Sequence, residues 1–515
     1  MKVLVIGAGG IIGQHLMISV PSGIDAVFTR KAEPNHLYEQ LDVTDKNAGD
    51  WVNTCNPDVI VNLAGESRPD VVEQNPTQCR EVNSLAVANM ASWCDDYSKH
   101  LIHVSSQAVL DPVNEYGKQK LEVDKMLESM AQNWSIIRPT FVLGIRPFPG
   151  IGRENPAERM LAGQEHQSVD DRYFAVAFAW DVAEIIWRLC QGPATKKVHH
   201  VGNPSRVSRY ELAVLLASNR DVVPVKHDDL LGLAPRPLDT SGPYATDSFR
   251  TGTFADGLIR LRQEWDSREA DDLSYRAKEL AAFLRVPYPV VEAKLGQGFG
   301  TLHNAVTEDF NRTNPKSDTE LTSWYRMTDS YLWELTAYHV DGGFNYQGMV
   351  GGIAKALKSY GVDRVLCLGD GVGSLTIALK EVGMCPFYHD LMDSRTAAFA
   401  RSRMVMRFQD YVNASLTASF DPGGLHVTPF DAVVSLDYLE HVPNVDVWAK
   451  FIYDELKPGG FFVAQNAFNM GSGPSGAMPM HLAVNDHWEK DWDPLLISVG
   501  FVQLSPQWYQ KPENS

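Results

Sequence analysis

The sequence lacks several features that would each point to a particular class of protein. No apolar run approaches the roughly 20 residues that a membrane-crossing helix needs. The six cysteines are scattered, with no C-x-x-C pair and no close Cys/His pairing of the kind that a structural zinc site uses. We therefore expect no membrane span, no metal site and reduced thiols.

Positive charge is also scarce. The chain holds 46 Lys and Arg against 64 Asp and Glu, which gives a net charge of −18. Such a surface repels phosphate backbones, so nucleic acid is not an expected partner. The first residues, MKVLVIGAGG, run directly into a strand pattern and do not form a secretory signal, so we expect a cytoplasmic protein.

The 515 residues exceed what one hydrophobic core organises, since cores stop growing at roughly 250 to 300 residues. Short apolar runs alternate with helical patterns twice along the chain, and this alternation is typical of parallel sheets covered on both faces. We predict an α/β protein with two tandem Rossmann-like, doubly wound domains, the second with an N-terminal helical cap. The expected boundaries are 1–250, a helical linker or cap at 251–320, and 321–515.

The first strand pattern, KVLVI, is followed at once by a glycine-rich turn that opens a helix, Gly7 to Gly13. Glycines at such a turn let backbone amides approach a pyrophosphate at the positive end of the helix. Two later turns fit the same ligand, namely Asp42-Val43 near an adenine ring and Leu63-Ala64-Gly65 at a strand end. This pattern predicts a dinucleotide site.

A possible reactive group follows. His103-Val104-Ser105-Ser106 ends a strand, and Tyr116 and Lys120 lie four residues apart, hence on one face of a helix. A lysine ammonium lowers the pKa of a neighbouring phenol toward neutrality, which makes tyrosine a usable general acid. An exposed Tyr/Lys pair with no role is the alternative.

The glycines Gly7, Gly10 and Gly13 with Ser106, Tyr116 and Lys120 resemble the extended short-chain dehydrogenase/reductases over residues 1–250. Arg138-Pro139-Thr140 and the segment 236–241 make the chain most similar to dTDP-4-dehydrorhamnose reductases. The resemblance implies that Ser106, Tyr116 and Lys120 are catalytic and that the substrate is a nucleotide-linked 4-keto sugar. The expected cofactor residues are Gly7, Gly10, Ile11, Ile12, Gly13, Arg30, Asp42, Val43, Leu63, Ala64, Gly65, Tyr116 and Lys120.

Two points are left open in this first half. Nine residues separate Ser106 from Tyr116, fewer than the family usually has, so the pocket is either more open or built for another substrate. Arg30 after the second strand suits the 2′-phosphate of NADP(H), whereas an acid there would favour NAD(H). A surface arginine without a ligand is the other interpretation.

The second half begins its strand–turn–helix pattern at Val365, where VLCLGDGVG lacks the G-K-[ST] of a phosphate loop. With Asp390 about twenty residues on, FDAVVSLDYLEHV and LKPGG, it resembles the class I methyltransferases over 320–515. The resemblance implies S-adenosyl-L-methionine as cofactor, bound by Gly369, Asp370, Gly371, Gly373, Asp390 and Asp437.

An O-methyl acceptor also benefits from a general base, and His441, His481 and His487 are the candidates. His481 is favoured because it lies in a Gly/Pro/Met-rich loop that could form a lid over the acceptor, although any of the three could be structural. The aromatic helical segment 324–339 is expected to cap the cofactor cleft.

Taken together, these patterns predict a bifunctional enzyme that reduces a keto-sugar nucleotide with NAD(P)H and methylates that sugar or a related small molecule. A homo-oligomer is compatible with this prediction. Two alternatives remain open for the first domain. It could be a catalytically weak binding or oligomerisation module beside an active methyltransferase, or an epimerase or dehydratase that recycles its nicotinamide.

Overall fold

The computed structural model describes residues 1–35, 37–217, 222–241, 252–341, 345–391, 393–408, 413–417, 429–468, 480–482 and 485–513. The chain divides into two compact units, Met1–Val291 and Glu292–Ser515. The first unit therefore includes residues 252–291, part of the stretch that the sequence pattern assigned to a linker. All six cysteines are free thiols. Within the described residues, no helix is long and apolar enough to cross a membrane.

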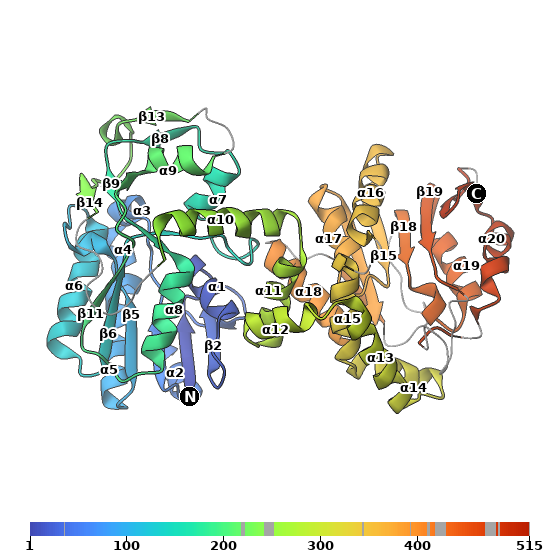
Figure 1. Cartoon of the computed structure of the whole chain (residues 1–515), viewed down its shortest axis with the longest axis horizontal. Helices are drawn as coiled ribbons and strands as arrows, with labels where there is room; N and C mark the ends of the chain where they lie inside the picture. Colours follow the sequence, from blue (N-terminus) through green and yellow to red (C-terminus); the bar gives the residue numbers. More distant parts are fainter. Residues whose placement is uncertain are drawn as a thin grey trace. The chain divides into compact units, whose positions relative to one another are not determined.

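The first unit is built on a seven-stranded parallel sheet with strand order β11-β6-β5-β4-β1-β2-β3 (Figure 1). Its strands are β1 (Lys2–Ile6), β2 (Asp25–Arg30), β3 (Glu39–Gln40), β4 (Val59–Asn62), β5 (His100–Val104), β6 (Trp134–Pro139) and β11 (Val198–Val201). The apolar runs of the sequence occupy β1, β2, β4, β5 and β6. Each needs apolar neighbours on both faces, since alternate side chains point to opposite sides.

Helices supply those neighbours. Residues of α2 (Ala48–Cys55), α5 (Ala86–Asp96) and α6 (Glu115–Met130) form one core cluster with the alternate strand residues Leu4, Ile6 and Ile60. Helix α1 (Ile11–Ile18) packs against α8 (Ala179–Cys190), which also contacts β5. The prediction of a Rossmann-like parallel sheet in the N-terminal region is confirmed.

Smaller elements complete this unit. Three short sheets pair β7 (Phe141–Leu143) with β10 (Val176–Phe178), β8 (Gln167–Val169) with β13 (Val223–Val225), and β9 (Tyr173–Phe174) with β12 (Val207–Ser208) and β14 (Asp239–Thr240). The remaining helices are α3 (Pro69–Gln74), α4 (Pro76–Arg80), α7 (Pro156–Leu161), α9 (Arg209–Leu216), α10 (Phe254–Glu269) and α11 (Leu273–Leu284), and α12 (Tyr288–Leu295) spans the division between the units.

The second unit also has a seven-stranded sheet, with strand order β17-β16-β15-β18-β19-β21-β20. The strands are β15 (Arg364–Leu368), β16 (Cys385–Leu391), β17 (Asn413–Thr417), β18 (Phe430–Leu436), β19 (Leu456–Gln465), β20 (Val502–Ser505) and β21 (Trp508–Gln510). β15 to β19 are parallel, whereas β21 is antiparallel to both β19 and β20. The sequence KPGG, interpreted as a turn, lies inside β19, where the register against β18 shifts.

Both faces of the second sheet are covered. Leu366 and Leu368 of β15 belong to a core cluster with α13 (Phe299–Thr313), α14 (Asp318–Met327), α19 (Val445–Glu455) and α20 (Trp488–Val499). The alternate residues Val365 and Cys367 belong to a second cluster with α16 (Tyr346–Ser359) and α17 (Ser374–Glu381). Helices α15 (Ser330–Asp341) and α18 (Arg395–Arg407) complete the unit.

Candidate functional site

The glycine turn of the first unit follows β1 as the sequence predicts. Gly7 has a φ of +75°, and a Cβ there would lie 2.6 Å from the backbone nitrogen of Ala64. A Cβ on Gly13 would lie 2.3 Å from the carbonyl oxygen of Ala8. These two glycines are required by close backbone packing, which brings the turn against the end of β4.

Gly10 has a different role, since a Cβ there would meet no atom within 4 Å. It is the N-cap of α1, and no side chain caps that helix. Ile11 and Ile12 form the first turn of α1 beside this open space. The first amides of an uncapped helix favour an anion, so the space fits the pyrophosphate of a dinucleotide.

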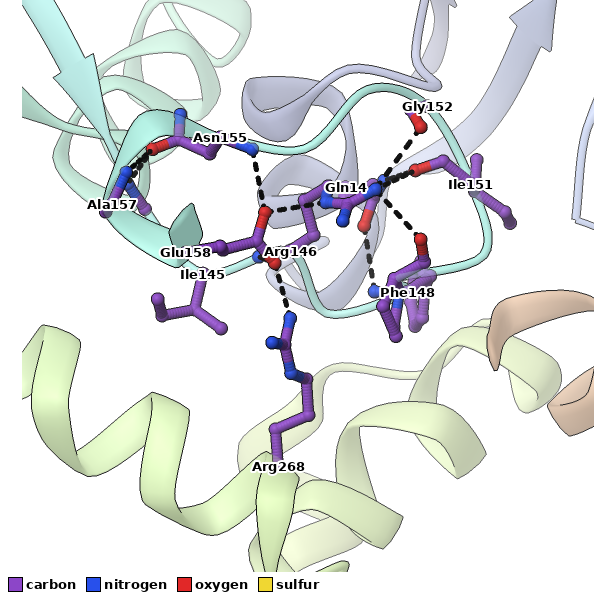
Figure 2. Close-up of polar contacts among 12 residues, drawn as sticks. Gln14, Ile145, Arg146, Phe148, Ile151, Gly152, Asn155, Ala157, Glu158 and Arg268 are labelled. Atoms are coloured by element: carbon purple, nitrogen blue, oxygen red, sulfur yellow. Dashed lines mark hydrogen bonds and ion pairs between the residues drawn. The ribbon is translucent and has the colours of Figure 1, made fainter. Parts of the chain in front are cut away.

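The turn is braced by Gln14 of α1, which is fully buried (Figure 2). Its Nε2 donates to the carbonyl oxygens of Ile151 at 2.8 Å and Gly9 at 3.1 Å, and its Oε1 accepts from the amide of Phe148 at 2.8 Å. A segment far away in the sequence is thereby fixed over the glycine turn. The sequence patterns gave no signal for this glutamine.

The same segment is held from its other side by a buried carboxylate, Glu158 (Figure 2). Its Oε2 accepts from Arg146 Nε at 2.7 Å and from the amide of Asn155 at 2.8 Å, and its Oε1 pairs with Arg268 of α10. Glu158 also completes a capping box at the start of α7. Helix α10 is thus tied to the segment that covers the glycine turn.

The residues expected around the adenosine half are placed as follows. Arg30 donates to the carbonyl oxygen of Glu33 at 3.1 Å and lies over the Tyr38 ring, 5.3 Å from its centroid. Asp42 pairs with Lys31 at 2.8 Å, and that hydrogen bond lowers the pKa of Asp42 to about 2. Neither contact distinguishes NADP(H) from NAD(H).

The other predicted cofactor residues of this unit lie at strand ends. Val43 follows Asp42 and packs partly against the sheet core. Leu63, Ala64 and Gly65 follow β4, and the amide of Ala64 donates to the Asn62 side chain at 3.1 Å. Gly65 has a φ of +154°, and a Cβ there would lie 3.8 Å from Lys120 Nζ. The turn after β4 and the lysine therefore meet.

Ser106, Tyr116 and Lys120 come together at the end of β5. Ser106 Oγ accepts from the amide of Ala108 at 3.2 Å, and Ser106 acts on the buried Tyr116 phenol in the direction that lowers its pKa. Lys120 Nζ donates to the carbonyl oxygen of Val104 at 3.2 Å. Tyr116 and Lys120 lie on the same helix, α6, next to the end of β5, and their catalytic roles stay predictions.

The surroundings of Tyr116 do not favour the lowered pKa that its spacing from Lys120 predicts. Burial raises the pKa of Tyr116, although its hydrogen bond with Ser106 acts in the opposite direction. Burial also lowers the pKa of Lys120 to about 8, so desolvation affects the ammonium as well. Burial of the phenol therefore outweighs the lowering that a lysine four residues away is expected to cause.

The short connection between Ser106 and Tyr116 packs directly on the start of α6. A Cβ on Gly117 would lie 2.8 Å from the carbonyl oxygen of Ala108, so glycine is required there. Asn114 caps α6 by accepting from the amide of Gly117 at 2.9 Å, and its Nδ2 donates to the carbonyl oxygen of Pro235 at 2.7 Å. The connection thus positions Tyr116 and holds the segment 234–241 beside it.

That segment contributes a cation. Arg236 pairs with Asp70 at 2.9 Å, and its charge partly offsets the rise that burial causes in the pKa of Tyr116. Further along the sheet, Arg138 donates to buried Asp124 at 2.7 Å, and the charge of Asp124 partly offsets the lowering that burial causes in the pKa of Lys120. Both arginines belong to the motifs Arg138-Pro139 and Arg236-Pro237 of the sequence.

In the second unit the turn after β15 contains three left-handed glycines, Gly369, Gly371 and Gly373, with φ of +62°, +48° and +79°. A Cβ on Gly369 would lie 2.1 Å from the Tyr438 ring. Asp370 does not face a ligand site: its carboxylate accepts from the amides of Leu375 at 3.0 Å and Thr376 at 2.7 Å at the start of α17. These contacts cap the start of α17, and cofactor binding by Asp370 stays a prediction.

A cavity of about 200 Å³ lies beside this turn. Its walls come from the ends of β15, β16 and β18 and from the aromatic side chains of α14 and α15. The expected aromatic cap thus contributes to the cavity wall. The residues used below are Tyr325, Tyr331, Glu334, Tyr338, Gly369, Gly371, Asp390, Asp437, Glu440, His441, Ala467, Met480 and His481.

Two predicted acids reach the cavity. Asp390 Oδ2 accepts from the amide of Gly371 at 2.8 Å and from Tyr388 Oη at 3.2 Å, and burial raises the pKa of Asp390 to about 7. Asp437, with a φ of +50°, accepts from Tyr338 Oη at 3.4 Å, and burial raises its pKa to about 6.

The three candidate histidines separate. His441 and His481 are buried at the cavity with ring centroids 4.7 Å apart, whereas His487 is exposed and is the N-cap of α20. Most of the loop interpreted as a lid, residues 469–479, lies outside the described residues.

The comparison with protein families matches the N-terminal region of the chain. Residues 1–241 match the family described as RmlD substrate binding domain. The chain is 26% identical over 313 residues to dTDP-4-dehydrorhamnose reductase of Mycobacterium tuberculosis, which covers 56% of this chain and 97% of the relative. It is also 26% identical over 301 residues to methionine adenosyltransferase 2 subunit beta of Pongo abelii, in an alignment that covers 49% of this chain and 85% of the relative.

Among solved structures, dTDP-4-dehydrorhamnose reductase from Bacillus anthracis in complex with NADP aligns over 51% of this chain and 99% of its own, with a TM-score of 0.45 and 20% identity. The N-terminal region, residues 1–241, is thus similar to the RmlD-like dTDP-4-dehydrorhamnose reductases.

Proposed function

We propose that the first unit binds NADP(H) or NAD(H) and reduces the keto group of a nucleotide-linked sugar. The grouping of Ser106, Tyr116 and Lys120 at the end of β5, next to the glycine turn, carries this proposal. The open, uncapped start of α1 fits the pyrophosphate. Similarity to dTDP-4-dehydrorhamnose reductases supports the substrate class.

The nicotinamide supplies the hydride in such a reaction. Ser106 and Tyr116 hold the keto oxygen by hydrogen bonds, and Tyr116 gives its proton to that oxygen as the alkoxide forms. The raised pKa of Tyr116 keeps the phenol protonated before substrate binds. Lys120 is charged below about pH 8 and stabilises the phenolate left after transfer. Arg236 adds positive charge on the same side.

We propose, as a second activity, that the C-terminal unit is a Rossmann-like class I methyltransferase that uses S-adenosyl-L-methionine on a sugar or another small molecule. The supporting observation is the cavity at the carboxyl ends of three parallel strands, where open α/β sheets bind their ligands. Gly369 and Gly371 present bare backbone there, and Asp390 offers a carboxylate for ribose hydroxyls. His481 is the proposed base.

In an alternative, the first unit binds the dinucleotide but does not reduce a substrate with it, and serves as a binding or oligomerisation module. The relative that is named as a subunit of methionine adenosyltransferase favours this alternative. The raised pKa of Tyr116 is compatible with it as well.

One experiment separates these functions. The full chain is incubated with dTDP-, UDP- and GDP-linked 4-keto sugars, NADPH and S-adenosylmethionine, and product masses are followed. The proposal expects a reduced sugar nucleotide formed with stoichiometric NADPH oxidation, and a species heavier by one methyl group. Dinucleotide binding without NADPH oxidation would support the binding module. Interconversion of sugars without net oxidation would identify an epimerase.

A further inference from the structure

Three side chains that the proposed methyl transfer does not jointly explain meet at one end of the cavity. Glu440 and His441 follow β18 in the turn Leu439–His441, and His481 comes from a segment forty residues later. Each of the three offers an atom that could bind a metal, and these atoms all lie within 4.8 Å of one another.

The main chain brings the two segments together. The amide of Leu482 donates to the carbonyl oxygen of Glu440 at 3.1 Å. Asn485 Nδ2 donates to the carbonyl oxygens of Val442 at 2.7 Å and Glu440 at 3.2 Å. These hydrogen bonds to main-chain carbonyls therefore hold together the two segments that carry the cluster.

Each of the three side chains is anchored through one atom. Glu440 Oε1 accepts from the amide of Ala467 at 2.9 Å. His481 makes a hydrogen bond with the backbone of the same Ala467. His441 Nδ1 lies 2.8 Å from Tyr325 Oη and 3.4 Å from the carbonyl oxygen of Met480.

On each of the three side chains, the second atom that could bind a metal remains available for a ligand bond. Glu440 Oε2 and His481 Nδ1 are buried and have no hydrogen-bond partner among the described residues. Because Nδ1 of His441 is already engaged, Nε2 is the ring nitrogen that could bind a metal. Buried polar atoms without partners cost free energy, and histidines that bind metals characteristically use their second ring nitrogen on a backbone or side-chain acceptor. Both properties are present here.

We propose that Glu440, His441 and His481 form a site for one divalent transition-metal cation. Two imidazoles and a carboxylate suit Zn²⁺, Co²⁺ or Fe²⁺, whereas Mg²⁺ and Ca²⁺ prefer all-oxygen ligands. Bonds of about 2.0–2.2 Å at roughly tetrahedral angles place ligand atoms about 3.3–3.6 Å apart, so atoms separated by as much as the 4.8 Å limit must approach one another by more than about 1 Å. The site departs from the sequence-based expectation of no metal, because ligands so far apart form no recognisable motif.

Three protein ligands leave coordination positions open toward the cavity. A cation there would bind a hydroxyl of the methyl acceptor and lower the pKa of that hydroxyl. With the cation bound, His481 is a ligand and no longer the base proposed above, so the acceptor hydroxyl would release its proton to water. Its oxygen would then form a bond to the sulfonium methyl group as the methyl–sulfur bond breaks and S-adenosylhomocysteine leaves. This role rests on the proposed methyltransferase function, whereas binding of the cation does not.

The test is a titration of the metal-depleted full chain with Co²⁺, followed by visible absorption and by equilibrium dialysis. We expect saturation at one Co²⁺ per chain and its displacement by Zn²⁺. Glu440→Gln and His481→Ala should each weaken binding at least about tenfold, since even indirect partners of ligands contribute 10- to 100-fold. His487→Ala, an exposed histidine outside the cavity, is the matched control and should bind as the unmodified chain does.

The proposal is overturned if the unmodified chain shows no saturable Co²⁺ binding, or if folded Glu440→Gln and His481→Ala bind Co²⁺ unchanged. X-ray absorption of the unmodified Co²⁺ complex covers the case in which both variants unfold. Two imidazoles in the coordination shell support the site, and their absence refutes it. S-adenosylmethionine binding, measured separately on the metal-free chain, shows whether the methyltransferase proposal fails independently.

Discussion

The two units carry different ionisable groups at the strand ends of their sheets, and in the second unit burial raises the pKa values of three of them, Asp390, Asp437 and Glu440. In the first unit, Lys120 and Arg236 lie around Tyr116, and the nearby acids are paired with arginines. In the second, the cavity is lined by four acids, Glu334, Asp390, Asp437 and Glu440. A site with cations suits a phosphate-bearing substrate, whereas an acidic cavity suits a cationic sulfonium. Similar sheets thus favour different ligands through the side chains at their strand ends.

The largest effect is expected from removing the proposed proton donor, Tyr116. Tyr116→Phe removes the donated proton and should lower the rate of ketone reduction by about 10²- to 10⁴-fold, while methylation by the other unit is unchanged. NADPH oxidation and methyl transfer are measured on the same preparation. Tyr97→Phe, at an exposed tyrosine, is the control. Reduction that persists in Tyr116→Phe would remove the first unit from the proposed enzyme class.

The charge network of the first unit is next in expected effect. Glu158→Gln leaves Arg146 and Arg268 buried without their counter-charge and should cost about 3–5 kcal/mol of unfolding free energy. Chemical denaturation with a probe in each unit should show an earlier transition for the first unit alone. Glu154→Gln, at an exposed acid, should change neither transition. Equal shifts in both units would show that they unfold together.

Asp390 tests the acidic cavity. Asp390→Asn keeps the shape but loses the charge, so affinity for S-adenosylmethionine should fall about 10- to 100-fold, the range for a hydrogen bond to a charged group. Because burial raises the pKa of Asp390 to about 7, the carboxylate is charged only above that pH, and affinity should decline as pH falls through 7. Calorimetry between pH 6 and 8 measures this.

The control for that experiment is Asp393→Asn, at an exposed residue with a φ of +64°, a conformation that asparagine tolerates. It should bind with the affinity and the pH dependence of the unmodified chain. Asp390→Asn with full affinity, or a flat pH profile in the unmodified chain, would contradict a ligand role for this acid.

The smallest effect concerns the pH profile of reduction. Lys120 has its pKa lowered to about 8 by burial, so its positive charge is present below that pH and is lost above it. The value of kcat/KM should therefore decline by up to about tenfold per pH unit above 8. A plateau extending to pH 10 would show that the charge of Lys120 is not needed.

The parts that the sequence predicted share one property: they depend on residues close together in the chain. Strand β1 and the turn from Gly7 to Gly13 form a contiguous pattern, as do Tyr116 and Lys120 on one helix. Asp370 shows the limit of such patterns, since a carboxylate after a strand can cap the next helix as readily as bind a ligand. Only the surrounding amides decide between these roles.

The features that were missed depend on residues distant in sequence. Gln14 reaches Ile151, and Glu158 reaches Arg268, across more than one hundred residues in each case. The pKa of Tyr116 is likewise set by burial, which no local spacing encodes. The meeting of Glu440 with His481 is of the same kind. Tertiary packing decides these properties, so they emerge only from the folded chain.

The proposed functions require that one chain carries two independent cofactor sites. Isothermal titration of the full chain with NADPH and with S-adenosylmethionine, each in the absence and presence of the other, tests it most directly. We expect one molecule of each ligand per chain, and neither ligand should change the affinity for the other. Asp390→Asn should weaken the binding of S-adenosylmethionine only. Competition between the two ligands, or binding of only one of them, would contradict it.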